Sequence, residues 1–104
     1  MKWYQFAATN ADNPGATVKL VAGVDESQMV ETLSSFMSHQ AKPSQSEALL
    51  FAIAILHKKA LQLISARIGN DHNFSLSEFQ NVDIDAPLRP PAFAKGGLSL
   101  WISH

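Results

Sequence analysis

The sequence contains no cysteine, which excludes disulfide bonds, thiolate metal ligands and a cysteine nucleophile. It also carries little charge, because Asp, Glu, Lys and Arg make up 16% of the residues, against about a quarter in typical soluble domains. With 8 basic and 9 acidic residues the net charge is −1, so no basic excess attracts nucleic acid or an anionic membrane surface. The scarcity of charge indicates that part of the surface is buried against a partner or a second copy.

Long hydrophobic runs are absent as well. The longest uninterrupted apolar run is ALLFAIAIL at residues 48–56, far shorter than the roughly 20 residues that span a bilayer. The opening MKWYQF is aromatic and polar, without the apolar segment of a secretory signal. We therefore expect a soluble cytoplasmic protein that has no nucleic-acid or membrane partner and needs no cofactor.

What is present is ample apolar content, 46% of a chain of 104 residues, which predicts one domain over residues 1–104. Residues 2–9 and 16–24 alternate in polarity and predict two strands joined by a turn at NADNPG. Pro14 and Gly15 suit the central positions of that turn. Alternation returns in residues 80–85 and 98–104, which predict two further strands.

Helix starts are indicated where Asp or Ser precedes Gln or Glu by three residues, the spacing of a capping box. Three pairs have it: Asp25–Gln28, Ser44–Glu47 and Ser75–Glu78. The first two predict helices over residues 26–40 and 45–68, the second ending at Gly69. The third pair predicts a short helical turn within residues 75–81.

The order β-β-α-α-β-β predicts an α+β domain of two layers. Its mainly antiparallel sheet of about four strands has the two helices packed on one face. The last strand is expected to pair with one of the first two. This pairing would close the domain and order both ends of the chain.

The second predicted helix is apolar on every side between residues 48 and 56. One sheet and one amphipathic helix cannot cover all of these sides. Phe51 and Ile55 are the side chains left over, and the same patch on a second copy is the simplest cover for them. The sequence therefore predicts a homodimer with Phe51 and Ile55 in its interface.

The stretch ARIGNDHNFSLSEF at residues 66–79 is rich in oxygen-bearing side chains and is therefore a candidate calcium loop. With Glu78 at position 12, Arg67 falls at position 1, where an acid is required, and His72 falls at position 6, where glycine is required. A calcium loop is therefore disfavoured. A capped helix end followed by a polar turn explains the composition, and Asp71 with His72 remain candidates for a functional loop.

The other candidate site residues lie far apart in the sequence. His57 stands on an apolar row of the second helix, where it is either a core-edge histidine or a general base or ligand. Arg89 and Lys95 accompany Gly96-Gly97, which form either an anion site or a flexible connection. No HExxH, GxSxG, SxxK or Walker motif occurs, so no catalytic residue and no metal ligand is predicted.

Two hypotheses of function follow. The leading one is a non-enzymatic protein-interaction module, such as an adaptor, regulator or immunity-type inhibitor, which is homodimeric. The alternative is a small-molecule or anion-binding protein, or an enzyme, with a pocket between loops 69–73 and 86–97. Its candidate ligand-binding residues are His57, Asp71, His72, Arg89 and Lys95, which should then converge on one cavity.

Overall fold

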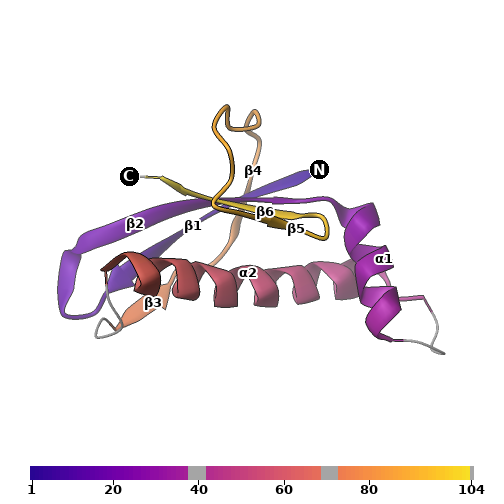
Figure 1. Cartoon of the computed structure of the whole chain (residues 1–104), viewed down its shortest axis with the longest axis horizontal. Helices are drawn as coiled ribbons and strands as arrows, with labels where there is room; N and C mark the ends of the chain where they lie inside the picture. Colours follow the sequence, from indigo (N-terminus) through magenta and orange to yellow (C-terminus); the bar gives the residue numbers. More distant parts are fainter. Residues whose placement is uncertain (38–41, 69–72, 104) are drawn as a thin grey trace.

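The computed structural model describes residues 1–37, 42–68 and 73–103. In this part of the chain six strands and two helices form an α+β domain of two layers (Figure 1). The elements are β1 (Lys2–Asn10), β2 (Asn13–Val24), α1 (Glu26–Phe36), α2 (Gln45–Ile68), β3 (Phe74–Leu76), β4 (Gln80–Val82), β5 (Phe93–Lys95) and β6 (Leu98–Ser103). The predicted fold class is confirmed, with six strands in place of about four.

The sheet is antiparallel throughout, with the strand order β3-β1-β2-β6-β5, and β4 pairs with the other part of β1. Helix α2 runs beneath the sheet, and α1 stands at one end of it on the same side (Figure 1). The last strand pairs with β2, which confirms that it returns to the first hairpin. The sequence analysis anticipated β4, which occupies the first half of the predicted strand at residues 80–85, but not the short strands β3 and β5.

The β1–β2 hairpin follows the predicted alternation. Tyr4, Phe6 and Ala8 are buried on the helix side of the sheet, and Phe6 lies opposite Leu20 of β2. The chain reverses within the predicted NADNPG segment, but Pro14 and Gly15 are not its central residues: the turn is at Ala11 and Asp12, three residues earlier, and β2 begins at Asn13.

The side chain of Asn10 explains the early turn. Its Oδ1 accepts a hydrogen bond from the backbone N–H of Asp12 at 2.8 Å, the local bond by which Asn favours turns. Pro14 and Gly15 lie in β2 as a consequence.

The predicted helical turn at residues 75–81 is also wrong, because β3 and β4 lie there and pair with β1. Between them Ser77 keeps contact with β1: its N–H donates to the Ala7 carbonyl at 2.8 Å, and its Oγ accepts from the Ala7 N–H at 2.9 Å. Phe79 then turns toward the core, where its ring stacks on Phe6 with centroids 3.9 Å apart. The open edge of β1 offers backbone partners along its length, and this pairing overrides the local capping signal.

Helix α2 begins and ends at the predicted residues, 45 and 68. Its capping box is complete: the Glu47 N–H donates to Ser44 Oγ at 3.1 Å, and the Ser44 N–H donates to Glu47 Oε1 at 3.3 Å. Helix α1 starts as predicted, with Asp25 as its N-cap, but ends at Phe36 instead of residue 40. The predicted C-terminal residue Gly69 lies outside the described residues.

The opposite face of the sheet carries a small aromatic cluster. The rings of Trp3 and Trp101 lie 5.5 Å apart between centroids, and a Cβ added at Gly23 would come within 2.9 Å of the Trp3 ring. The connection from β4 to β5, residues 83–92, passes above this face and is called the arch below (Figure 1). It is fastened by Trp101 Nε1, which donates to the Arg89 carbonyl at 2.8 Å.

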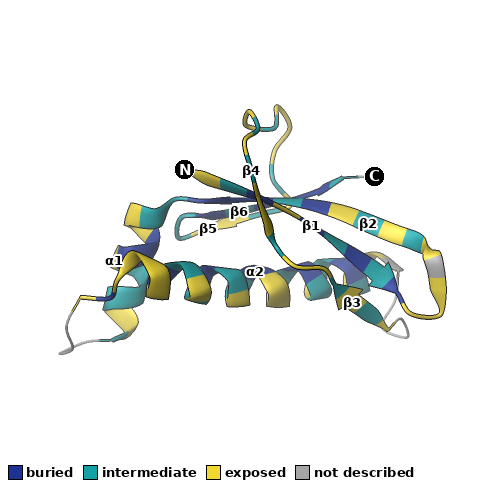
Figure 2. Cartoon of the chain, turned by 180° about the vertical axis from the view of Figure 1, so that it is seen from behind, coloured by how far each residue is buried: buried dark blue, intermediate teal, exposed yellow. Residues whose placement is uncertain are grey.

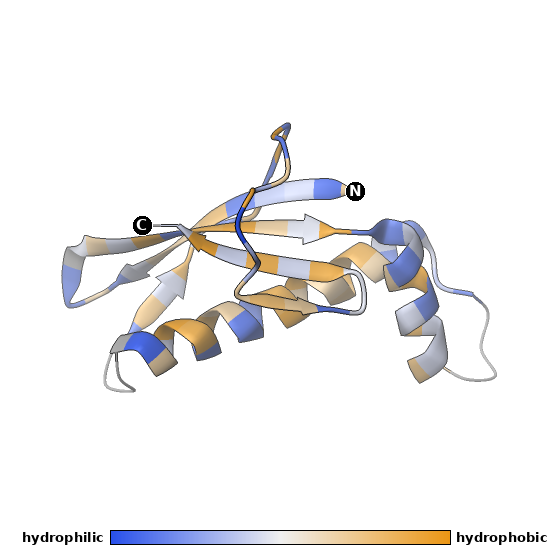
Figure 3. Cartoon of the chain, turned by 45° about the horizontal axis from the view of Figure 1, so that its top comes forward, coloured by the Kyte–Doolittle hydropathy of each residue, from blue (hydrophilic) through white to orange (hydrophobic). Residues whose placement is uncertain are grey.

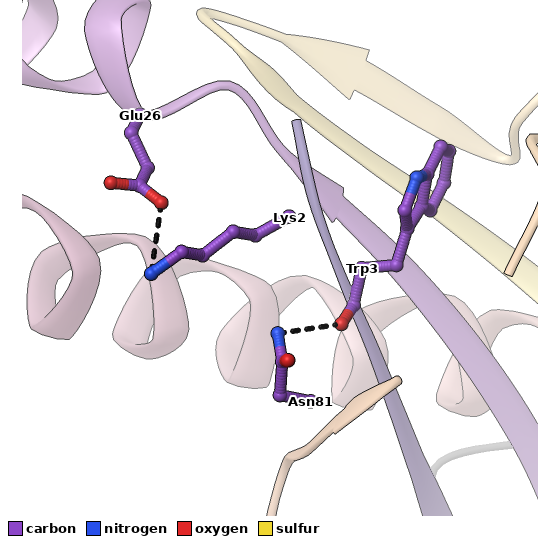
Figure 4. Close-up of polar contacts among 4 residues, drawn as sticks. All are labelled: Lys2, Trp3, Glu26 and Asn81. Atoms are coloured by element: carbon purple, nitrogen blue, oxygen red, sulfur yellow. Dashed lines mark hydrogen bonds and ion pairs between the residues drawn. The ribbon is translucent and has the colours of Figure 1, made fainter. Parts of the chain in front are cut away.

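Two polar contacts hold the start of β1 in place (Figure 4). The Lys2 ammonium group pairs with the Glu26 carboxylate of α1 at 3.0 Å, and Asn81 Nδ2 donates to the Trp3 carbonyl at 3.2 Å. The hydrogen bond to Glu26, together with its charge, raises the pKa of Lys2 above its ordinary value. The first strand is thereby joined to α1 and to β4.

We expect Ser44→Ala to lower the free energy of unfolding by about 1 kcal/mol, because the substitution leaves the Glu47 N–H without its cap. Ser46→Ala is the matched control, since Ser46 is exposed in the same helical turn, and its effect should stay within about 0.5 kcal/mol. Urea denaturation of both variants measures the difference. Equal losses in the two variants would contradict the assigned capping box.

Candidate functional site

A cavity of about 280 Å³ lies where α1, α2 and the β5–β6 hairpin meet. All three elements contribute to its lining: Met29, Thr32, Phe36, Ile55, Lys59, Phe93, Lys95, Gly96 and Leu98. Most of these side chains are apolar, and two are lysines. Such a mixture of an apolar wall and a few charged groups is typical of small-ligand sites.

The Gly96-Gly97 turn positions one wall of the cavity. Both glycines have positive φ angles, 60° and 92°, as a two-residue hairpin turn with two left-handed residues requires. The Gly97 carbonyl accepts from the Asp25 N–H at 2.8 Å, and the Gly96 carbonyl accepts from Thr32 Oγ1 at 3.3 Å. The pair is therefore a tight turn bonded to α1, and not the flexible connection that was one of the two interpretations of its sequence.

The cations of the cavity come from different elements. Lys59 of α2 places its Nζ 5.1 Å from the centre of the Phe93 ring, within the range of a cation–π contact. Lys95 lies opposite Leu98 in the β5–β6 pair, so its side chain leaves the sheet on the helix side. Across the described segments of the chain, neither lysine pairs with a carboxylate.

Helix α2 presents a second candidate surface on the side that faces away from the sheet (Figure 2). Leu50, Ile53, Ala54 and Leu61, the outer strip, share this side by their helical spacing. Leu50 is 69% exposed, Ala54 is also exposed, and Ile53 and Leu61 are half-buried. Within the described part of the chain, the outer strip is therefore an apolar surface that is exposed at Leu50 and Ala54 and half-buried at Ile53 and Leu61.

The side of α2 that faces the sheet uses mainly small residues. Ala48, Ala52, Leu56, Ala60 and Ile64 recur every four residues and are buried. Alanines let the helix approach the sheet closely, and the bulkier apolar side chains then fall on its flanks and outer side. Figure 3 shows how much of the helix is hydrophobic.

By length and composition alone, Gln45–Arg67 would also suffice to cross a membrane, which counting uninterrupted apolar residues did not reveal. That is weak evidence for a membrane span, because the core helix of a soluble protein meets the same criterion. Of the 18-residue stretch concerned, 28% is buried. Among the described residues, the rest of this stretch is half-buried or exposed.

The structure separates the predicted ligand-binding residues that it describes. Lys95 lines the cavity, whereas His57 is exposed on α2 and lies among the residues of the outer strip. Arg89 belongs to the arch and donates through Nη2 to the Ile102 carbonyl at 3.1 Å. Asp71 and His72 lie outside the described residues. Of the two predicted loops, 86–97 contributes Lys95 and Gly96 to the described lining of the cavity, and residues 69–72 of the other lie outside the described residues.

The predicted interface residues Phe51 and Ile55 are half-buried. The Phe51 ring meets Phe36 of α1 edge-on at 5.9 Å between centroids, and Ile55 lines the cavity. The structure thus gives both residues neighbours within their own chain. The more exposed apolar side chain of α2 is Leu50, which the sequence analysis did not single out.

Lys59 and Phe93 were missed as site residues. Lys59 stands beside Lys58 in a polar part of the helix, a pattern typical of a solvated face. Phe93 lies in a strand of three residues, too short to give a periodic signal. The nearby Gly96-Gly97 pair was the only sequence feature that pointed to this corner of the fold.

No group of three or more His, Asp or Glu side chains within the described residues is placed to hold a metal ion. No protein family, characterised protein or solved structure gives a significant match to this chain. Proposals about its function therefore rest on the cavity and the outer strip.

We expect Gly97→Ala to reduce stability by about 1–3 kcal/mol, because a φ of 92° strains any residue with a Cβ. The added atom would also approach Gln28 Cβ to 3.0 Å and the Asp25 carbonyl oxygen to 3.2 Å. Gly15→Ala is the control, since its nearest contact is 3.6 Å away. Thermal unfolding compares the two. A loss from Gly15→Ala as large as that from Gly97→Ala would refute a special role for this turn.

Proposed function

We propose that this protein is a non-enzymatic interaction module that forms a homodimer through the outer strip of α2. Adaptors, regulators and immunity-type inhibitors are the classes of protein that such a module fits. The observation that carries the proposal is the low burial of an apolar helix, since 28% of its most hydrophobic stretch is buried and Leu50 is 69% exposed. The strip is also consistent with a separate protein partner, which is the less economical version of the same function.

A second copy is the occupant that needs the fewest assumptions. In a twofold dimer the same surface serves both subunits, so one apolar strip is complementary to itself. The net charge of −1 offers little repulsion between copies. Full burial of one leucine side chain stabilises by about 1.5–3 kcal/mol, and Leu50 is 69% exposed before association.

The geometry of such a dimer follows from the fold. The 24 residues of α2 extend about 36 Å, along the long dimension of the molecule. Two copies that meet through their outer strips stack as sheet, helix, helix and sheet. The cavity and the arch stay outside this contact, because they lie beside or beyond the sheet-facing side of α2.

We expect Leu50→Lys to shift the protein from dimer to monomer, since it replaces the most exposed large apolar side chain of the outer strip by a charged one. Gln62→Lys is the matched control: Gln62 is exposed on the same helix, about 120° around the axis from Leu50, and its variant should remain dimeric. Native mass spectrometry of the wild type and both variants counts the subunits.

A monomeric wild-type protein would contradict the dimer directly. Equal dissociation of Leu50→Lys and Gln62→Lys would show that the interface is not the outer strip. Circular dichroism of each variant distinguishes dissociation from unfolding.

The alternative function, binding of a small molecule or an anion, is favoured by the cavity that contains Lys95. An enzymatic role gains no comparable support, because the described residues that line the cavity include no His, Asp, Glu or Cys. We also propose that the protein is cytoplasmic and has no nucleic-acid or membrane partner. The composition and charge of the chain support this placement.

A further inference from the structure

We propose that the cavity between α1, α2 and β5 binds a small amphipathic monoanion, a carboxylate on a medium-length apolar body. The inference rests on the lining of the cavity and its charge. It does not depend on the homodimer, because Ile55 and Lys59 lie about 140° and 180° around α2 from Leu50.

The interior of the cavity suits the apolar body. Met29 and Leu98 are nearly inaccessible to solvent, and Ile55 and Phe93 are half-buried beside them. A methionine adapts its shape to a bound chain at small energetic cost. Burying a ligand's methylene groups here stabilises the complex by about 0.8 kcal/mol for each group removed from water.

The two lysines set the sign of the ligand's charge. Among the described residues that line the cavity, Lys59 and Lys95 are the charged ones, and no carboxylate accompanies them. An anionic head group would gain charge-assisted hydrogen bonds from their ammonium groups. A cationic ligand would be repelled, and a neutral one would forgo this gain.

Thr32 contributes little to head-group selection. Its hydroxyl group donates to the Gln28 carbonyl at 2.9 Å and lies 3.3 Å from the Gly96 carbonyl. These contacts occupy its proton and connect the helix to the turn. The specificity of the site therefore depends on Lys59 and Lys95.

The volume limits the size of the ligand. At about 280 Å³ the cavity lies just below the range of roughly 300–1,000 Å³ that holds drug-sized molecules. A single acyl chain of medium length fits this space better than a cofactor or a two-chain lipid. Decanoate is a suitable probe, with decanol as its neutral counterpart and decylammonium as its cationic one.

The test is a titration of the ¹⁵N-labelled protein with each probe below its micelle-forming concentration, followed by amide NMR. We expect decanoate to shift the amides of Thr32, Gly96 and Leu98 saturably and to bind roughly tenfold more tightly than decanol. Decylammonium should bind more weakly still. Shifts confined to the outer strip, or equal binding of decanoate and decanol, would overturn the proposal.

Substitutions of the lysines identify which of them binds the anionic head group. Lys59→Met and Lys95→Met should each weaken the binding of decanoate severalfold and leave the binding of decanol unchanged. Lys58→Met is the control, because Lys58 is the exposed neighbour of Lys59, and it should change the binding of neither probe. The exposed Lys95 side chain makes Lys95→Met informative even if Lys59→Met disturbs folding. An effect of Lys58→Met equal to that of Lys95→Met would show general charge attraction and contradict a defined site. Native mass spectra of the same samples report the dimer separately.

Discussion

The packing of α2 against the sheet is the constraint on which the rest of the structure depends. Small residues, Ala48, Ala52 and Ala60, occupy much of the line of closest approach, while the core is filled largely by sheet residues such as Leu20 and Leu100. The helix is thus held near the sheet, and its larger apolar side chains are displaced to its flanks and outer side. One flank forms the cavity and the outer side forms the outer strip.

The position of α1 follows from the same arrangement. Because α2 occupies the length of the sheet, α1 is left at one end, where it covers Phe51 through Phe36. The Gly96-Gly97 turn meets α1 there and fixes its first turns through carbonyl acceptors. The space bounded by these elements is the cavity, so a ligand in it would touch α1, α2 and the hairpin simultaneously.

The long elements were predictable because each repeats its pattern several times. Alternation in β1 and β2, and the Ser44–Glu47 cap of α2, were sufficient for the two-layer fold. The short strands β3 and β5 were not predictable, since three residues such as Phe93–Lys95 carry no period of their own and exist only through pairing with a neighbour.

The same limit applies to the candidate site. Lys95 was found through the adjacent glycines. Lys59 was not, because its contact with Phe93 joins residues far apart in sequence. Whether Phe51 and Ile55 lack a cover within the chain depends on how much of α2 is covered by α1. That coverage depends on the angle between the two helices, which sequence patterns do not determine. Leu50 was overlooked because its exposure depends on which side of α2 faces the sheet. That side is occupied mainly by alanines, so Leu50 lies on the opposite side.

The central claim is that the outer side of α2 is covered by a second copy. The absence of cysteine permits one spin label per chain, attached to Lys58→Cys beside the outer strip or to Lys19→Cys on the exposed face of the sheet. Pulsed electron spin resonance then measures the distance between the two copies. A short distance from position 58 and a long one from position 19 is the predicted result. No dipolar coupling at either position, or the shorter distance at position 19, would contradict the claim.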